Sequence, residues 1–268
     1  MSGAAVLTLD SATKLDGRHR GAVVVCGSPG GVYPGDLAAQ AGLRAVVLND
    51  AGVGLERAGI GGLAYCEALG MAAATVGHDS ARIGDGADMR VRGRISHVNR
   101  VARSVGCAPG QGVADALARL VRAPAWQGMP PPYREGRAVV VDEPGRRRVI
   151  CIDSASMVAP SDAGQIVITG SHGGMLASLP GLVLQVDAFA ALFNDAGIGI
   201  DDAGVSRLPA LDRRGIAAAA VDAMSARIGD GRSTFEDGVL SRVNRTAEGL
   251  GAVPGLPART WVEHLLAG

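Results

Sequence analysis

The stretch Gln165-Ile166-Val167-Ile168-Thr169-Gly170-Ser171-His172-Gly173-Gly174 carries an apolar run directly into a glycine-rich loop. The stretch Ala22-Val23-Val24-Val25-Cys26-Gly27-Ser28-Pro29-Gly30-Gly31 has the same form, and its loop differs only by Pro29 in place of His172. A short, continuous apolar run that ends in glycines is typical of a strand buried on both faces, as in a parallel sheet covered by helices. The two stretches therefore predict two copies of one α/β unit.

Further motifs extend this repeat along the chain. Asn49-Asp50-Ala51-Gly52 matches Asn194-Asp195-Ala196-Gly197, and Ser80–Gly86 matches Ser225–Gly231. The offset is 143 residues at the glycine loops (27 against 170) and 145 residues at the later motifs (49 against 194), so the second copy holds two extra residues near Pro180. Self-similarity at a nearly fixed offset indicates an internal duplication.

The duplication predicts an α/β protein of two tandem lobes, each with a mainly parallel sheet flanked by helices, related by pseudo-two-fold symmetry. We place the first repeat at residues 1–122, a proline-rich linker with the start of a hairpin at 123–148, and the second repeat at 149–268. The hairpin is expected to pair residues 138–141 with residues 149–152.

Helices are expected at three places within each copy. One follows the glycine loop, one follows the Asn-Asp-Ala-Gly motif, and one closes the copy. In the first copy the closing helix is predicted from an apolar stripe formed by Ile95, Val98, Val101, Ala102 and Val105.

Composition and charge narrow the classes of partner. The 268-residue chain has 26 basic and 26 acidic residues, so its formal net charge is zero. We expect no nucleic-acid or membrane partner, because the sequence shows neither a basic cluster nor a long apolar span. No signal segment opens the sequence and the four cysteines are scattered, which favours a cytoplasmic location. We expect a small-molecule substrate and assembly as a homo-oligomer.

The sequence also limits the cofactors. Lys14 is the only lysine, so a phosphate-binding loop of the GxxxxGK[ST] type is absent. The glycine loops are not of the GxGxxG type, which disfavours a dinucleotide. Lys14 follows Ser11 at the spacing of a Ser–Lys nucleophile pair, but the accompanying motifs of the enzymes that use this pair are missing. We expect no organic cofactor.

The repeated polar motifs all follow predicted strands. In open parallel sheets, ligands bind beyond the carboxyl ends of the strands, so these loops are expected to meet at one rim. The glycine loops are candidates to bind an anion through their backbone N–H groups, and the alternative is a tight turn without a ligand. The residues that we assign to substrate binding in these loops are Ser28, Gly30, Gly31, Gly173 and Gly174.

Arg82 and Arg227 occupy the same place in the two copies. A guanidinium binds carboxylate or phosphate through two parallel hydrogen bonds, so we assign both arginines to substrate binding. Their neighbours Asp85 and Asp230 complete the predicted binding residues, and the alternative is an ion pair within each loop.

The Asn-Asp pairs end a third strand in each copy. We assign Asn49 and Asn194 to substrate binding. Asp50 and Asp195 are candidates for a general base, for orienting a histidine or for holding Mg²⁺, and helix capping is the alternative. We expect no metal, with Mg²⁺ as the alternative.

The exchange of His172 for Pro29 indicates that the copies have specialised. His172 beside Ser171, with Asp195 on the neighbouring strand end, predicts a base with an orienting carboxylate, and we assign these three residues to catalysis. His78, where the second copy has Ala223, is the candidate for the same chemistry in the first copy.

These residues predict a cofactor-independent enzyme that acts on a small carboxylate- or amide-bearing metabolite. Hydrolysis of a C–N bond is the expected reaction. The alternatives are an isomerase or lyase acting on a small carboxylate, or a non-catalytic ligand-binding or regulatory protein that uses the cleft between the lobes.

Overall fold

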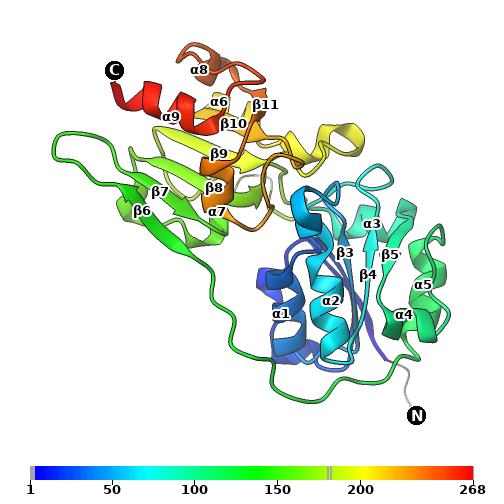
Figure 1. Ribbon diagram of the computed structural model, residues 1–268. Coiled ribbons are helices and arrows are strands. Elements are labelled where there is room, and N and C mark those ends of the chain that lie inside the picture. The colour runs from blue at the N-terminus through cyan, green and yellow to red at the C-terminus, as the bar shows by residue number, and fades with distance from the viewer. Residues whose placement is uncertain (1–3, 180, 182, 268) are drawn as a thin grey trace.

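The computed structural model describes residues 4–179, 181 and 183–267, which form an α/β protein with two mixed β-sheets (Figure 1). The first sheet contains β1 (Val6–Leu9), β2 (Val23–Pro29), β3 (Ala45–Asn49), β4 (Ala72–Val76) and β5 (Ile95–Val98). The second sheet contains β6 (Arg137–Val141), β7 (Val149–Ile152), β8 (Ile166–His172), β9 (Ala190–Asn194), β10 (Ala217–Val221) and β11 (Leu240–Val243). We call residues 4–122 the first lobe, residues 123–136 the linker and residues 137–267 the second lobe.

The strands lie side by side in chain order, as β1-β2-β3-β4-β5 and as β11-β10-β9-β8-β7-β6. The inner strands of both sheets are parallel, whereas β5, β6 and β11 pair antiparallel at the edges. The pairing of β6 with β7 confirms the hairpin predicted around the start of the second repeat.

Helices cover both faces of each sheet, because alternate strand residues are apolar on both sides. Val23 and Val25 of β2 pack into one apolar cluster, and Val24 and Cys26 pack into another on the opposite face. The α-helices are α1 (Val32–Gln40), α2 (Gly61–Ala68), α3 (Gly86–Arg92), α4 (Arg100–Ser104), α5 (Val113–Leu120), α6 (Leu208–Asp212), α7 (Gly231–Glu236), α8 (Arg245–Glu248) and α9 (Ala258–Ala267). None of these helices in the described chain is long and apolar enough to span a membrane.

Short 3-10 helices occupy several strand-to-helix connections. They are η1 (Ala12–Lys14), η2 (Gly17–His19), η3 (Leu55–Ile60), η4 (Ala155–Met157), η5 (Pro160–Asp162) and η6 (Ile200–Val205).

The helix expected after the second glycine loop is absent from the described residues. The first loop leads into α1, but residues 175–179, 181 and 183–189 form no helix, and Pro180 itself lies outside the described residues. This segment crosses to the first lobe, where Ala177 N donates to Gly84 O at 3.0 Å and Ser178 N donates to Asp10 Oδ2 at 2.7 Å. The backbone N–H groups at the start of the segment are therefore used between lobes and not within a helix.

The closing helix of the first copy also differs from the prediction. Residues 95–98 form strand β5, which pairs antiparallel with β4. Helix α4 begins only after Asn99, whose Oδ1 accepts a hydrogen bond from Ala102 N at 2.9 Å. The apolar residues predicted to form one helical stripe therefore belong to two elements, strand β5 and helix α4.

The two lobes meet through a pair of left-handed loops. Ala51-Gly52-Val53-Gly54 has φ values of 49°, 73°, 64° and 69°, and Ala196-Gly197-Ile198-Gly199 has values of 51°, 72°, 62° and 71°. A Cβ built on Gly197 would lie 2.8 Å from Gly52 Cα. Residues other than glycine rarely adopt this left-handed conformation, because it costs about 1–2 kcal/mol of free energy for each such residue. The loops therefore depend on the packing between the lobes.

Two backbone hydrogen bonds and a small apolar cluster surround this crossing. Leu55 N donates to Ala223 O at 2.8 Å, and Ile200 N donates to His78 O at 2.9 Å. The buried side chains between the lobes are Ala51, Ile83, Ala196, Ala203 and Ile228.

Substituting Gly197 by alanine tests the crossing. The new Cβ would lie 2.8 Å from Gly52 Cα and 2.9 Å from His78 Cδ2, which adds overpacking to the cost of a left-handed alanine. We expect Gly197→Ala to lower the free energy of unfolding by about 3 kcal/mol, measured by urea titration.

Gly215→Ala is the matched control for this variant. Gly215 has a φ of 69°, but no atom lies within 4 Å of a Cβ at that position. The control should therefore lose only about 1 kcal/mol, the cost of the backbone conformation. Equal losses in the two variants would contradict the close contact as the source of the effect.

Candidate functional site

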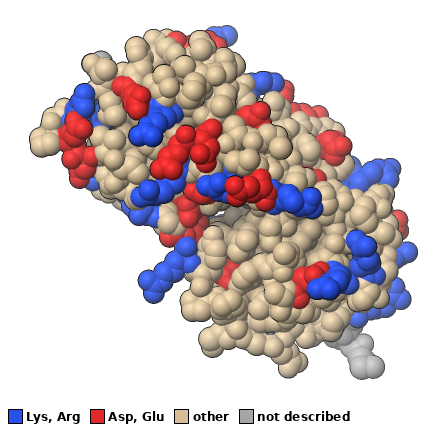
Figure 2. Space-filling view, viewed as in Figure 1, with Lys and Arg blue, Asp and Glu red and all other residues tan. Residues whose placement is uncertain are grey.

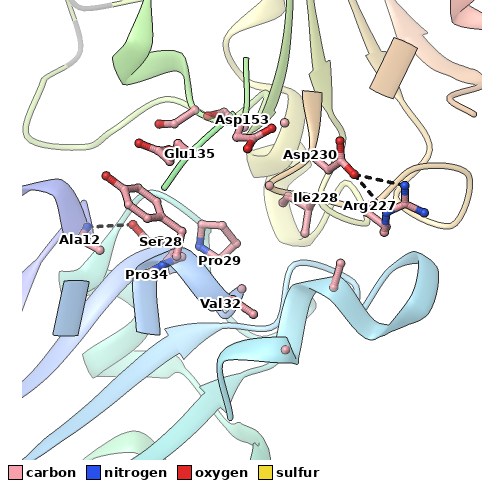
Figure 3. A pocket seen from close by; sticks show the side chains of 18 of the residues that line it. Ala12, Ser28, Pro29, Val32, Pro34, Glu135, Asp153, Arg227, Ile228 and Asp230 are labelled. Carbon is pink, nitrogen blue, oxygen red and sulfur yellow. Dashed lines mark hydrogen bonds and ion pairs between the residues drawn. The ribbon is translucent and has the colours of Figure 1, made fainter. Parts of the chain in front are cut away.

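A cleft of about 360 Å³ lies between the lobes, and its wall combines both sheets with the linker (Figure 3). Ser28 and Pro29 line it from the end of β2, and Ser171 and His172 line it from the end of β8. Figure 2 shows acidic and basic side chains alternating in a row where the lobes meet, beside a hollow in the surface. The cleft thus lies at the carboxyl ends of parallel strands, where open α/β sheets bind ligands.

Ser28 and Ser171 each hold a neighbouring strand end in place. Ser28 Oγ accepts a hydrogen bond from Ala12 N at 2.9 Å, and Ser171 Oγ accepts one from Ala155 N at 2.8 Å. A hydroxyl that accepts in this way still has its own proton to donate. Both predicted serines therefore line the cleft as hydrogen-bond donors.

The loop glycines are required by space and not by a left-handed backbone. None of the glycines in the described glycine loops has a left-handed φ, but a Cβ at Gly30 would lie 2.6 Å from Gly59 O. Gly173 and Gly174 are packed similarly, against carbonyl oxygens of η6 at 2.9 and 2.6 Å from the Cβ position. Gly31 lines the cleft, whereas the other three predicted glycines serve this close packing.

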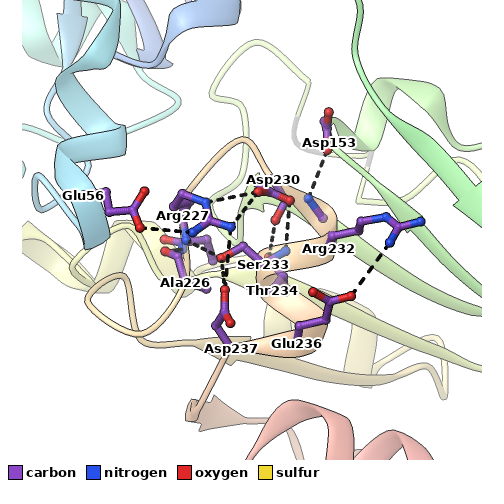
Figure 4. A network of polar contacts seen from close by, with 12 residues as sticks. Glu56, Asp153, Ala226, Arg227, Asp230, Arg232, Ser233, Thr234, Glu236 and Asp237 are labelled. Atoms are coloured by element: carbon purple, nitrogen blue, oxygen red, sulfur yellow. Dashed lines mark hydrogen bonds and ion pairs between the residues drawn. The ribbon is translucent and has the colours of Figure 1, made fainter. Parts of the chain in front are cut away.

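Arg227 lies at one end of the cleft among carboxylates (Figure 4). Its guanidinium is 3.3 Å from Glu56, 3.2 Å from Asp230 and 3.7 Å from Asp237. Asp230 also caps α7 by accepting from Ser233 N at 2.9 Å. A ligand anion at Arg227 would compete with these carboxylates, so the geometry favours the ion-pair alternative.

Arg82 makes comparable ion pairs outside the lining of the cleft. Its guanidinium is 3.7 Å from Asp88 and 2.8 Å from Asp201 of the second lobe. Asp85, the partner expected from the sequence, instead caps α3 by accepting from Asp88 N at 2.8 Å. The ion pair between Arg82 and Asp201 therefore joins the two lobes.

Asn49 and Asn194 are fully buried behind the cleft and shape the left-handed loops. Asn49 Oδ1 accepts from Ala51 N at 2.9 Å, and Asn49 Nδ2 donates to Ala81 O at 3.3 Å. Asn194 makes the same two bonds with the matching residues of the second lobe, at 2.9 and 3.1 Å. These contacts explain the predicted asparagines without a ligand.

Asp50 and His78 form an ion pair beside the inter-lobe crossing. Asp50 Oδ1 accepts from both His78 N and His78 Nδ1, at 3.0 and 2.9 Å. The hydrogen bond with Asp50 outweighs burial and raises the pKa of His78. Burial alone would raise the pKa of Asp50, but the bonds from His78 lower it. The histidine–carboxylate pair expected from the sequence is thus present in the first lobe, away from the described lining of the cleft.

Asp195 has no such partner, because Ala223 occupies the position of His78. Asp195 Oδ1 accepts from Gly197 N and Ala223 N, each at 2.9 Å. Burial outweighs these bonds and raises the pKa of Asp195. No described hydrogen bond joins Asp195 to His172, so the contacts do not assemble the base and orienting carboxylate predicted in the second lobe.

His172 is buried at the border of the cleft and accepts a hydrogen bond. Its Nδ1 accepts from Gly174 N at 3.1 Å, which leaves the ring proton on Nε2. Burial and the nearby Arg207 guanidinium lower the pKa of His172 to about 3. His172 is therefore a neutral hydrogen-bond donor at physiological pH, and the proton-transfer role predicted for it is not favoured.

Sequence reasoning missed the carboxyl group and the aromatic rings that line the other end of the cleft. Glu135 and Tyr133 reach it from the linker, and Tyr133 stacks on Tyr33 of α1 with 5.6 Å between ring centroids. Burial, followed by the Asp153 charge, raises the pKa of Glu135. The signal available in the sequence was an aromatic residue and an acid, two residues apart, after a run of prolines.

Asp153 is fixed by the linker and by α7. Its Oδ2 accepts from Gly136 N at 2.5 Å, and its Oδ1 accepts from Gly231 N at 3.1 Å. The first bond holds the residue next to Glu135 against Asp153, and Figure 3 shows the two carboxyl groups on the same side of the cleft. Asp153 begins the sequence Asp-Ser-Ala, which also begins at Asp10 in the first lobe, and this repetition was the sequence signal for the residue.

A metal site is not formed by the acidic residues that can be described. Across residues 4–179, 181 and 183–267, no group of three or more His, Cys, Asp or Glu is arranged to hold a metal ion.

Comparison with known proteins found no match to the chain among family models, curated proteins or solved structures.

The ion pair between Asp50 and His78 predicts a pH-dependent stability. The pKa of His78 is raised above its ordinary value of 6.5, so the stabilisation is complete below pH 6.5 and is lost as pH rises through the raised pKa. We expect the free energy of unfolding to fall between pH 6 and pH 9 by more in the wild type than in His78→Gln, measured by urea titration at each pH.

His264→Gln is the control, because His264 is exposed on α9. It should show the wild-type fall. A fall of equal size in His78→Gln and the wild type would show that the pair does not stabilise the fold.

Proposed function

We propose that the protein is an enzyme that hydrolyses a C–N bond of a small amide-bearing metabolite in the inter-lobe cleft, without an organic cofactor. The observation that supports this most is the pair of carboxyl groups, Glu135 and Asp153, held together at one end of the cleft. Pairs of titratable groups in different environments are the usual basis of acid–base catalysis by carboxyl groups.

Glu135 is the proposed proton donor and acceptor. It is partly buried beside the Asp153 carboxylate, and burial together with that charge raises its pKa although the hydrogen bond with the Tyr33 hydroxyl lowers it. A carboxyl group with a raised pKa keeps its proton closer to neutral pH, which suits a general acid. Asp153, held by two backbone N–H groups, keeps a fixed position from which to orient water or substrate.

The two ends of the cleft fit a ligand with two different ends. Arg57 lines the cleft next to Glu56, which is bound to Arg227, so Arg57 lies at the end away from Glu135. Pro29, Val32 and Ile228 separate the two ends with apolar surface, as Figure 3 shows. A substrate with a carboxylate at Arg57 and an amide at Glu135 fits this arrangement.

The proposed reaction uses water as the only co-reactant. Water attacks the amide carbon while the Glu135 carboxylate takes one of its protons. The C–N bond then breaks as Glu135 gives a proton to the leaving nitrogen, which yields a carboxylic acid and an amine. Ser28 and Ser171 contribute hydroxyl donors to the cleft wall.

We also propose that the two lobes arose by duplication, are related by a pseudo-two-fold axis, and specialised. The axis would pass between Gly52 and Gly197, because contacts on either side match at the 145-residue offset. The bond from Leu55 to Ala223 matches the bond from Ile200 to His78. Homo-oligomeric assembly stays part of the proposal and is tested by light scattering.

A non-catalytic ligand-binding protein is the second candidate. Two observations favour it. The serine hydroxyls already accept backbone hydrogen bonds, and the low pKa of His172 disfavours proton transfer by the predicted base. An isomerase or lyase would use the same carboxyl pair on a small carboxylate.

Glu135→Gln tests the proposal after a ligand screen. N-acyl amino acids, cyclic amides and ureides are first screened for a rise in melting temperature, and each hit is assayed for amine release. We expect Glu135→Gln to keep the thermal shift but to lose turnover by at least about 100-fold, because general acid–base catalysis contributes this much.

Glu143→Gln is the matched control, since Glu143 is exposed in the β6–β7 turn and pairs with Arg146 at 2.7 Å. It should turn over hits like the wild type. Thermal shifts without turnover in the wild type would support the binding protein. Undiminished turnover in Glu135→Gln would remove the carboxyl pair from the mechanism.

A further inference from the structure

A second pocket, of about 250 Å³, adjoins the cleft on the side of the second lobe. It shares Ser171 and His172 with the cleft and extends toward the irregular segment that follows the second glycine loop. Leu176 and Leu184 from that segment form part of its wall, and Lys14 reaches it from the first lobe. This pocket is therefore built by both lobes.

The charge of this pocket is opposite to that of the carboxyl end of the cleft. Its described lining contains the cations Lys14 and Arg207 and includes no Asp or Glu. The hydroxyl groups that line it are those of Ser11, Thr13, Ser154, Ser156 and Ser171. Cations and hydroxyl donors without carboxylates form the kind of surface that binds an oxyanion.

Arg207 is the most unusual residue of the pocket. Its exposed fraction is 7%, and its Nε–H makes no hydrogen bond to the described residues. One Nη2 bond to Gly174 O, at 2.9 Å, and the ring of Phe193, 5.0 Å from the guanidinium carbon, are its described polar and aromatic contacts. A buried charge is costly unless an opposite charge and hydrogen bonds accompany it. Among the described residues, no carboxylate forms an ion pair with this buried guanidinium.

Gly174 links Arg207 to His172. The Gly174 carbonyl accepts from Arg207, while the Gly174 N–H donates to His172 Nδ1 at 3.1 Å. That second bond leaves Nε2 of the neutral imidazole with its proton. Gly174 thus holds the Arg207 guanidinium through its carbonyl and the His172 imidazole through its N–H.

The matching place in the first lobe is filled. Arg207 N donates to Gly173 O at 2.8 Å, and Gly62 N makes the matching bond to Gly30 O at 2.8 Å. The first lobe therefore has Gly62 where the second has Arg207. A Cβ at Gly35 of α1 would lie 3.3 Å from Gly62 Cα, so α1 packs directly onto this glycine. Where the first lobe packs a helix, the second lobe has a long cation and a pocket.

We propose that this second pocket is a binding site for a small oxyanion, the phosphate or carboxylate group of a metabolite, held by Arg207, Lys14 and His172. Arg207 provides the buried charge, and His172 Nε2–H adds a neutral donor. Lys14 contributes a charge from the other lobe, so binding of the anion joins the lobes. The proposal does not depend on the hydrolytic reaction in the cleft.

Thermal unfolding in three sodium salts at matched ionic strength tests this site. Inorganic phosphate and acetate are the probes for the two oxyanion classes, and chloride is the reference. We expect phosphate or acetate, at 100 times its Kd, to raise the melting temperature of the wild type by about 5–10 °C over chloride. Arg207→Met should fold, because replacing a buried charge by an apolar side chain is often tolerated, and should lose this shift.

Arg213→Met is the matched control, because Arg213 is exposed just after α6 and the change in net charge is the same. It should keep the wild-type shift. Lys14→Gln, at an exposed residue, should bind the anion at least 10-fold more weakly and serves as the second variant if Arg207→Met does not fold. Glu135→Gln should keep the full shift, which separates this site from the reaction in the cleft.

A response to phosphate alone or to acetate alone would assign the class of oxyanion. A wild type that responds to neither anion would overturn the proposal. So would an equal shift in Arg207→Met, or an equal shift in Lys14→Gln where Arg207→Met does not fold, because the anion would then bind elsewhere.

Discussion

The close backbone crossing of Gly52 and Gly197 is the contact on which the rest of the structure depends. Each glycine lies in a run of four residues with left-handed φ, and these runs include Val53 and Ile198, whose β-branched side chains disfavour that conformation. This backbone conformation is unfavourable, but it lets one loop pass directly against the other with no side chain between them. Hydrogen bonds and a small apolar cluster then surround the crossing. The carboxyl ends of both sheets are thereby held on the two sides of one cleft.

Differences between the lobes matter as much as their likeness. Gly62 in the first lobe allows α1 to pack tightly beside α2, whereas His172 and Arg207 in the second lobe line a pocket whose wall includes a segment without a helix. The first lobe therefore packs a helix at this place, whereas the second lobe has a pocket there. The cleft therefore adjoins a pocket whose lining residues differ from its own in charge.

Charge is distributed so that each site has a distinct polarity. Near the linker the cleft presents Glu135 and Asp153, and at its other end Arg227 is balanced by surrounding carboxylates. In the adjoining pocket the described lining has cations and hydroxyl groups without carboxylates. A net charge of zero for the whole chain thus conceals strong local differences.

Much of the fold could be predicted from the sequence because strands that are buried on both faces appear in it as continuous apolar runs. Continuous apolar runs located the inner strands, and glycines marked the ends of β2 and β8 where the backbone packs too closely for a Cβ. The candidate site was predicted only in part. Ser28, Ser171 and His172 were found through the repeat, but Glu135 lies in a linker whose path depends on how the lobes are joined. The isolated charge of Arg207 is equally invisible in the sequence, since it follows from a helix that one lobe has and the other lacks. Local pattern determined the elements, and only the packing of distant segments decided which side chains share a site, because that depends on contacts that no short stretch encodes.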